Sequence, residues 1–157
     1  MKTDLPQDVI PGTVLLVEDD PRDAELILAA LEENRLANHV ILVRDGEEAL
    51  DYLHRRGTFH DRPRGNPIFV LLDNKMPKVS GLEVLKAMKA DKLLKDIPVV
   101  ALTASRLTPD LIAFQKHGVN SHLLKPIDFA ELMKAVQQLD LSWTAVNQRQ
   151  PVPSISS

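Results

Sequence analysis

TVLLVEDD, residues 13–20, joins a short apolar run to three consecutive acids. Four more short apolar runs follow it along the chain, namely HVILV (39–43), IFVLL (68–72), IPVVAL (97–102) and NSHLL (120–124). Four of the five are rich in β-branched residues, which is typical of strands buried on both faces. Stretches of helical period separate the runs. The sequence therefore predicts an α/β protein whose five-stranded parallel sheet is covered by helices on both faces.

Short polar side chains mark the expected helix starts, because they accept hydrogen bonds from the free amides of a first turn. The candidates are Asp20 before Pro21, Asp45 three residues before Glu48, Ser80 three before Glu83, Thr108 before Pro109, and Asp128 three before Glu131. Three of these pairs resemble capping boxes. Five helices are expected, one after each strand.

Composition excludes several classes of protein. The chain has no cysteine, so disulfides and thiolate-based sites are absent, and a reducing cytosol is compatible with that. A net charge of −3 with scattered Lys and Arg argues against direct binding to DNA. No apolar stretch is long enough to cross a bilayer, and residues 1–12 have no signal-peptide pattern. We expect a cytoplasmic protein without a membrane span.

The length of 157 residues suits one domain with its own core. We expect a flexible N-terminus over 1–11, one domain over 12–141 and a partly disordered C-terminal extension over 142–157, because NQRQPVPSISS is polar and rich in proline. GTFHDRPRGNP, residues 57–67, is predicted to be a loop.

Polar residues directly follow four of the expected strands, where ligands of an open α/β sheet bind. They are Glu18, Asp19 and Asp20 after the first strand, Asp73 after the third, Thr103 at the end of the fourth and Lys125 after the fifth. Acids on neighbouring strand ends repel one another unless a cation lies among them, and hard oxygen ligands suit Mg²⁺. A carboxylate beside Mg²⁺ and an ammonium could attack phosphorus in line. The pattern predicts a magnesium site built for phosphoryl transfer.

Each of these residues has a plainer interpretation when it is taken alone. A single Asp after a strand is commonly a cap or turn residue, and Asp20 is assigned to that role because Pro21 follows it. Thr103 could be an ordinary strand end, and Lys125 a solvated loop lysine. Only their joint occurrence in this order favours a site. A flavodoxin-type cofactor is disfavoured, since no Gly-rich loop follows 13–17 and the acids there would repel an anion.

The segments VEDDPRDAE, LLDNKMPKVSG, VVALTAS and LLKP together resemble the receiver domains of bacterial response regulators, over roughly 12–139. The resemblance implies a doubly wound, flavodoxin-like sheet of strand order 2-1-3-4-5 and Mg²⁺ as cofactor. It also implies roles for individual residues: Asp73 as phosphoacceptor and metal ligand, Glu18 and Asp19 as the metal-binding acids, the backbone carbonyl of Lys75 as a further metal ligand, Thr103 as the switch hydroxyl, and Lys125 as the lysine that binds the phosphoryl group.

The long loop before 68–72, the segment ADKLLKDIPVV and a last helix extended to Trp143 are most similar to stand-alone receivers that serve phytochromes. This narrower resemblance implies a separate sensor histidine kinase, with a bacterial phytochrome as the candidate. It also implies a homodimer through the fourth helix, fifth strand, fifth helix and C-terminal extension. Leu141 and Trp143 are candidate interface residues, although Trp143 could equally pack back on the last helix.

Three residues depart from the family pattern or border its chemistry. His122 stands where receivers usually carry an aromatic switch residue, so it could add pH sensitivity; the alternative is a solvent-facing histidine. Lys75, two residues after Asp73, and Ser105, two after Thr103, are expected to influence the phosphoryl lifetime.

The predicted function is that of a single-domain response regulator. Asp73 takes a phosphoryl group from a phosphohistidine of the kinase, Thr103 moves inward, and the surface of the fourth helix, fifth strand and fifth helix changes. Such a protein assists its own phosphorylation and dephosphorylation but is not otherwise an enzyme. The alternative is a receiver-fold interaction module that works without phosphorylation. A Mg²⁺-dependent phosphatase would normally need a second nearby acid and a cap segment, and the sequence contains no segment for a cap.

Overall fold

The computed structural model describes residues 10–33, 37–63, 65–104 and 109–139. Four residues singled out in the sequence, Ser105, Thr108, Leu141 and Trp143, lie outside the described residues. The proposed roles of Ser105, Leu141 and Trp143 and the expected cap at Thr108 therefore stay predictions, as do the limits of the two terminal segments.

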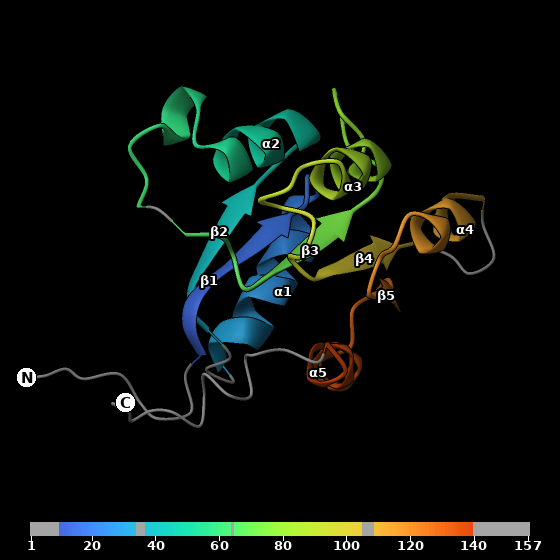
Figure 1. The fold of residues 1–157 in the computed structure, drawn as a ribbon. Coiled ribbons are helices and arrows are strands. Elements are labelled where there is room, and N and C mark those ends of the chain that lie inside the picture. The colour runs from blue at the N-terminus through green and yellow to red at the C-terminus, as the bar shows by residue number, and fades with distance from the viewer. Residues whose placement is uncertain (1–9, 34–36, 64, 105–108, 140–157) are drawn as a thin grey trace, which may run out of the picture.

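The described residues form five strands and five α-helices that alternate along the chain (Figure 1). The strands are β1 (Ile10–Val17), β2 (Ala37–Val43), β3 (Phe69–Asp73), β4 (Val99–Thr103) and β5 (Ser121–Leu124). The helices are α1 (Pro21–Glu33), α2 (Gly46–His54), α3 (Gly81–Lys89), α4 (Pro109–Lys116) and α5 (Phe129–Gln137), with a short 3-10 turn η1 (Gly57–Phe59) after α2. All neighbouring strands are parallel in the order β2-β1-β3-β4-β5. The predicted fold class and strand order are confirmed.

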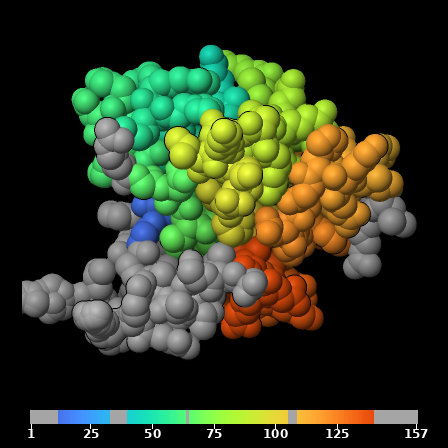
Figure 2. All heavy atoms as spheres, viewed as in Figure 1, coloured from blue at the N-terminus to red at the C-terminus, as the bar shows by residue number. Residues whose placement is uncertain are grey.

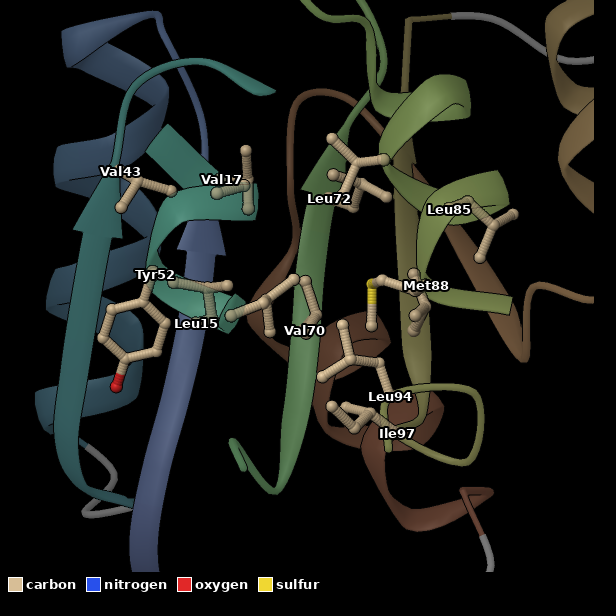
Figure 3. Close-up of a cluster of buried hydrophobic side chains, with 14 of the residues drawn as sticks. Leu15, Val17, Val43, Tyr52, Val70, Leu72, Leu85, Met88, Leu94 and Ile97 are labelled. Atoms are coloured by element: carbon tan, nitrogen blue, oxygen red, sulfur yellow. The ribbon is translucent and has the colours of Figure 1, made fainter. Parts of the chain in front are cut away.

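The two faces of the sheet bury separate apolar clusters, since side chains alternate along a strand. In β1, Val14 and Leu16 pack towards α1 and α5, whereas Leu15 and Val17 pack towards α2 and α3. Figure 3 shows the second cluster, in which Leu15 and Val17 lie beside side chains of β3 and the covering helices. Burial on both sides explains why the run 13–17 is continuously apolar.

The starts of α1, α2, α3 and α5 follow the predicted polar residues. Ser80 and Glu83 form a full capping box, because each side chain accepts a hydrogen bond from the other residue's amide. Asp45 accepts from the amide of Glu48 at 2.8 Å. Glu48 accepts from Arg44 rather than from Asp45, so this pair is a cap without the reciprocal bond.

The loop over 57–67 is held against α2 by the guanidinium group of Arg62. Its Nε donates to the carbonyl of Tyr52 at 2.6 Å, and its Nη1 donates to those of Pro63 at 2.8 Å and Gly65 at 3.0 Å. The guanidinium carbon also lies 4.2 Å from the centre of the Tyr52 ring.

In Figure 2 the segment joining α3 to β4, drawn in yellow, fills the space between α2 and α4 on the visible face.

Candidate functional site

The candidate site lies at the carboxyl end of the sheet, where the parallel strands bring the predicted residues together. Glu18 and Asp19 follow β1, Asp73 ends β3 and Thr103 ends β4. Lys125 follows β5, and its amide donates to the carbonyl of Thr103 at 2.8 Å. β1 and β3 are neighbours at the centre of the sheet, so the acids that follow them face one another.

Three carboxylates form a compact group at this edge. Glu18, Asp19 and Asp73 each offer an oxygen, and these oxygens all lie within 4.8 Å of one another. Glu18 is 1% and Asp73 5% exposed, whereas acids are ordinarily found at the surface. Burial of like charges this close is unfavourable unless cations compensate them.

Lys125 supplies one such cation. Its Nζ lies 3.0 Å from Oε1 of Glu18 and 3.2 Å from Oδ1 of Asp73. A third carboxylate, that of Asp23 on α1, lies 3.1 Å from the same nitrogen. One ammonium is therefore shared among three acids, and the group with Asp19 keeps an excess of negative charge.

Burial and mutual repulsion shift the protonation of these groups. Burial, together with the charge of Asp73, raises the pKa of Glu18 from 4.5 to about 7. Burial also raises the pKa of Asp73, against the opposing effect of Lys125. Burial acts to lower the pKa of Lys125, but the hydrogen bond to Glu18 and the charge of Asp73 outweigh it and raise that pKa. The ammonium therefore stays charged, whereas the pKa of Glu18 is brought close to neutral pH.

The donor set fits a hard divalent cation. Oε1 of Glu18 is buried and receives no hydrogen bond from the part of the chain that the structure describes, although the Lys125 ammonium is nearby. Carboxylate oxygens are the ligands that Mg²⁺ takes in proteins, usually one or two at a time with water completing the shell. A cation here would use that oxygen and offset the excess negative charge.

An open hollow of about 590 Å³ gives access to these groups. Besides the site residues, it is lined by Asp20, Arg22, Asn74, Lys75, Ala104 and Asp110. Asp20 accepts a hydrogen bond from the amide of Arg22 at 2.8 Å, which is the helix-capping role expected for it. Lys75 is exposed at the rim.

His122 does not reach this hollow. It is exposed on β5 and lines a separate groove of about 760 Å³, together with Leu111 and Gln115 of α4 and Glu131 of α5. The side chain faces solvent here, and its role in the switch stays a prediction.

The loop after Asp73 is tightly packed on both sides. A Cβ atom on Gly81 would overlap the carbonyl oxygen of Asp73, and one on Gly46, the first residue of α2, would overlap that of Val79. Lys78 in this loop lies 3.3 Å from Glu47 of α2. The loop after Asp73 is thereby held against α2 at Lys78 and Val79.

Sequence reasoning missed two residues of this region. Asp23 is four positions beyond Asp19 and falls within a predicted helix. Acids are common on the exposed face of a helix, so its position in the sequence does not indicate a role in the site. Gly46 was passed over because a glycine at a helix start has many explanations. Both become visible only when β1, β3 and the helices are packed together.

A doubly wound sheet with buried acids, a hydroxyl and a lysine at its carboxyl edge defines the receiver class of signalling domains. A family model described as the response regulator receiver domain matches residues 14–137, and the chain belongs to this family.

Two relatives are similar to this chain over most of their length. The chain is 40% identical over 146 residues to the probable methanogenesis regulatory protein FilR2 of Methanothrix harundinacea, covering 92% of this chain and 90% of the relative. It is 38% identical over 133 residues to response regulator Rcp1 of Synechocystis, covering 85% and 89%.

Several solved structures of response regulators are also similar to this chain. The bacteriophytochrome response regulator AtBRR is 52% identical with a TM-score of 0.77, over 83% of this chain and 93% of that one. RtBRR, also a bacteriophytochrome response regulator, is 48% identical with a TM-score of 0.78, over 83% and 78%. A Mn²⁺-bound form of Rcp1 is 35% identical with a TM-score of 0.71, over 92% and 100%. The described residues contain no helix that is long and apolar enough to span a membrane.

Proposed function

We propose that this receiver is a phosphorylation switch in which Asp73 accepts a phosphoryl group from a phosphohistidine of a sensor histidine kinase. The observation that carries the proposal is the placement of Asp73, which is 5% exposed at the floor of an open hollow, 3.2 Å from the Lys125 ammonium and beside two further acids. A buried carboxylate among these groups costs stability, and a catalytic need for it explains the cost.

The transfer would exchange one bond for another. An Oδ atom of Asp73 attacks phosphorus in line, the P–N bond of the phosphohistidine breaks, and its electron pair leaves with the imidazole nitrogen. Lys125 donates a hydrogen bond to an oxygen of the transferred group, for which its position beside Asp73 suits it. The hydroxyl of Thr103, at the end of the neighbouring strand, donates another and is drawn inward.

Glu18, Asp19, Asp73 and the backbone carbonyl of Lys75 would hold Mg²⁺. When bound, the cation neutralises negative charge on the phosphoryl oxygens. The buried Oε1 of Glu18, which has the Lys125 ammonium as its neighbour but receives no hydrogen bond from the described residues, and the compact carboxylate group support the choice of a hard divalent cation. The Mn²⁺-bound form of Rcp1 shows that one relative of this chain takes such a cation.

The output would be a change in the surface formed by α4, β5 and α5. Thr103 ends β4, the strand between the phosphorylated carboxylate and β5, so its inward movement leaves space on the α4 side. The groove that contains His122 lies on this surface and would repack. We propose that a second copy of the chain binds here, and that the protein does not bind DNA directly.

The kinase partner is proposed from the relatives. Two of the similar solved structures are those of bacteriophytochrome response regulators, so a phytochrome-type light-sensing kinase is the proposed donor. A role for Lys75 in the lifetime of the phosphoryl group is also proposed. Lys75 is exposed at the rim of the hollow, where its charge would slow the hydrolysis of the phosphoryl group or redirect the water that attacks it. We expect Lys75→Asn to change the phosphoryl half-life, and an unchanged half-life would count against this role.

Incubation with Mg²⁺ and acetyl phosphate, followed by intact mass measurement, tests the proposed function. The wild-type chain should gain one phosphoryl group, and Asp73→Asn should gain none. Asp96→Asn, an exposed acid before β4, is the matched control and should behave as wild type. If the wild-type chain is modified neither by acetyl phosphate nor by a phosphorylated histidine kinase, the interaction-module alternative replaces this proposal.

A further inference from the structure

Asp23 lies among the residues of the site but has no part in the compact carboxylate group. Its Oδ2 is 3.1 Å from Nζ of Lys125, and its side chain is 26% exposed. The group of oxygens within 4.8 Å of one another contains Glu18, Asp19 and Asp73 but not Asp23. Asp23 is therefore a partner of the ammonium and not of a bound cation.

The first turn of α1 fixes the place of Asp23. Its amide donates to Oδ1 of Asp20 at 3.4 Å, and the amide of Ala24 donates to the carbonyl of Asp20 at 2.9 Å. The side chain has only two rotatable bonds between this helix and its carboxylate. Lys125, in contrast, lies after an edge strand and reaches the site through a flexible stem of four carbons.

The carboxylates that contact Lys125 differ in whether they would also bind the proposed cation. Glu18 and Asp73 are shared between the ammonium and the cation site. A divalent cation would draw their oxygens away from the ammonium. Asp23 is then the carboxylate that still holds Lys125, because it offers no oxygen to that site. An ammonium has three donors, so a bond to Asp23 leaves two for oxygens at Asp73.

We propose that Asp23 is a positioning residue that keeps the Lys125 ammonium within bonding distance of Asp73 during phosphoryl transfer. The inference rests on the proposed function. Without Asp23 the lysine stem would have to lose its rotational freedom at the moment of reaction, which raises the barrier. Asp23 would not touch the phosphoryl group and acts only through Lys125.

The rate of phosphorylation by acetyl phosphate at saturating Mg²⁺ tests this role. We expect Asp23→Ala to slow the reaction about tenfold, which is below the roughly hundredfold that a misplacement of about 1 Å can cost. Asp23→Asn keeps an acceptor oxygen and should recover most of the rate. Mg²⁺ affinity should change less than about twofold in both variants, since Asp23 is outside the cation site.

A double-mutant cycle with Lys125→Met separates positioning from a general effect. If Asp23 acts through the lysine, Asp23→Ala should have no further effect in the Lys125→Met background. Asp110→Ala is the matched control: this acid lines the same hollow, but the described residues include no ion pair between it and Lys125. Its rate should stay within about twofold of wild type.

Several outcomes would overturn the inference. An unchanged or faster Asp23→Ala reaction, additive losses in the cycle, or an equal loss in Asp110→Ala would each do so. Thermal unfolding of every variant with EDTA checks that the fold is intact. If Asp23→Ala does not fold, Asp23→Leu, which also lacks an acceptor oxygen, takes its place with the same expected loss of rate. Failure of the proposed function would differ, because the wild-type chain itself would then not be phosphorylated.

Discussion

The ammonium of Lys125, which follows β5, lies 3.2 Å from Oδ1 of Asp73, which ends β3, although β4 lies between these two strands. The lysine follows an edge strand and reaches across the end of β4 to meet the acid that ends β3. Together with Glu18 and Asp23, this pair concentrates charge in a mostly buried place. Its electrostatic consequences can be measured without any phosphate donor.

Lys125→Met should destabilise the chain mainly at high pH. The substitution leaves buried carboxylates without their cation, so we expect a loss of about 3 kcal/mol of unfolding free energy at pH 8. The loss should shrink towards pH 5, because Glu18, whose pKa is raised to about 7, is then protonated and no longer needs a partner. Urea unfolding at both pH values with EDTA measures this. Lys92→Met, an exposed lysine, is the control, and equal losses at the two pH values would contradict the prediction.

Glu18→Gln should stabilise the chain when no divalent cation is present. A carboxyl whose pKa is raised by folding destabilises the fold as pH rises from its unfolded pKa through the folded one, here from 4.5 to about 7. At pH 8 the neutral amide should therefore add up to about 3 kcal/mol, and at pH 4 almost nothing.

The same substitution should remove most of the stabilisation by Mg²⁺. Thermal unfolding of wild type and Glu18→Gln at pH 8, each with EDTA and with Mg²⁺, measures both effects. Glu25→Gln, an exposed acid on α1, should respond as wild type does. A Glu18→Gln chain that is less stable than wild type in EDTA at pH 8 would show that the Lys125 ion pair outweighs the cost of burial.

Gly46→Ala should lower the affinity for Mg²⁺, although Gly46 is not one of the proposed metal ligands. The added methyl group would overlap the carbonyl oxygen of Val79, so the loop after Asp73 must shift. We expect a loss of about 2 kcal/mol of stability and a reduction in Mg²⁺ affinity of about tenfold. Val136→Ala, a buried change on the opposite face of the sheet, should cost similar stability without changing Mg²⁺ affinity. Equal Mg²⁺ affinities in the two variants would show that the contact between Gly46 of α2 and Val79 does not support the cation site.

Arg62→Met should release the loop over 57–67 and leave the site intact. Three of its hydrogen bonds to carbonyls are 3.0 Å or shorter, so we expect a loss of about 2 kcal/mol and faster hydrogen exchange in the loop. The loop leads into the amino end of β3, so Mg²⁺ affinity should not change. Arg56→Met breaks an exposed ion pair with Asp51 and should cost below about 1 kcal/mol. Comparable losses in the two variants would contradict the role of Arg62.

The fold was predictable because its determinants are local. The run 13–17 lies inside the observed β1, and the run 68–72 overlaps β3 in all but its first residue. Strands buried on both faces must be apolar without interruption, and helices need polar caps, so both features are written directly in the sequence. The first strand is longer than expected because Ile10 pairs with Ala37 beyond a register shift, which no apolar pattern encodes.

The site was predictable only as a set of strand-end residues. Parallel strands align their carboxyl ends, so acids after β1 and β3 had to meet, and the structure brings Glu18, Asp19 and Asp73 together. His122 was harder to place, because β5 is an edge strand whose residues alternate between the core and solvent. A one-residue change of register decides which way such a side chain faces.

The sequence by itself determined the fold class, the strand order implied by its family resemblance, and the acids, hydroxyl and lysine that stand at the strand ends. Tertiary structure alone decided that Asp23 of α1 shares Lys125, that α2 braces the loop after Asp73, and that burial raises the pKa of Glu18 to about 7. The physical reason is that periodicity and capping depend on neighbours along the chain. Ion pairing, steric contact and desolvation depend instead on atoms that only packing brings together.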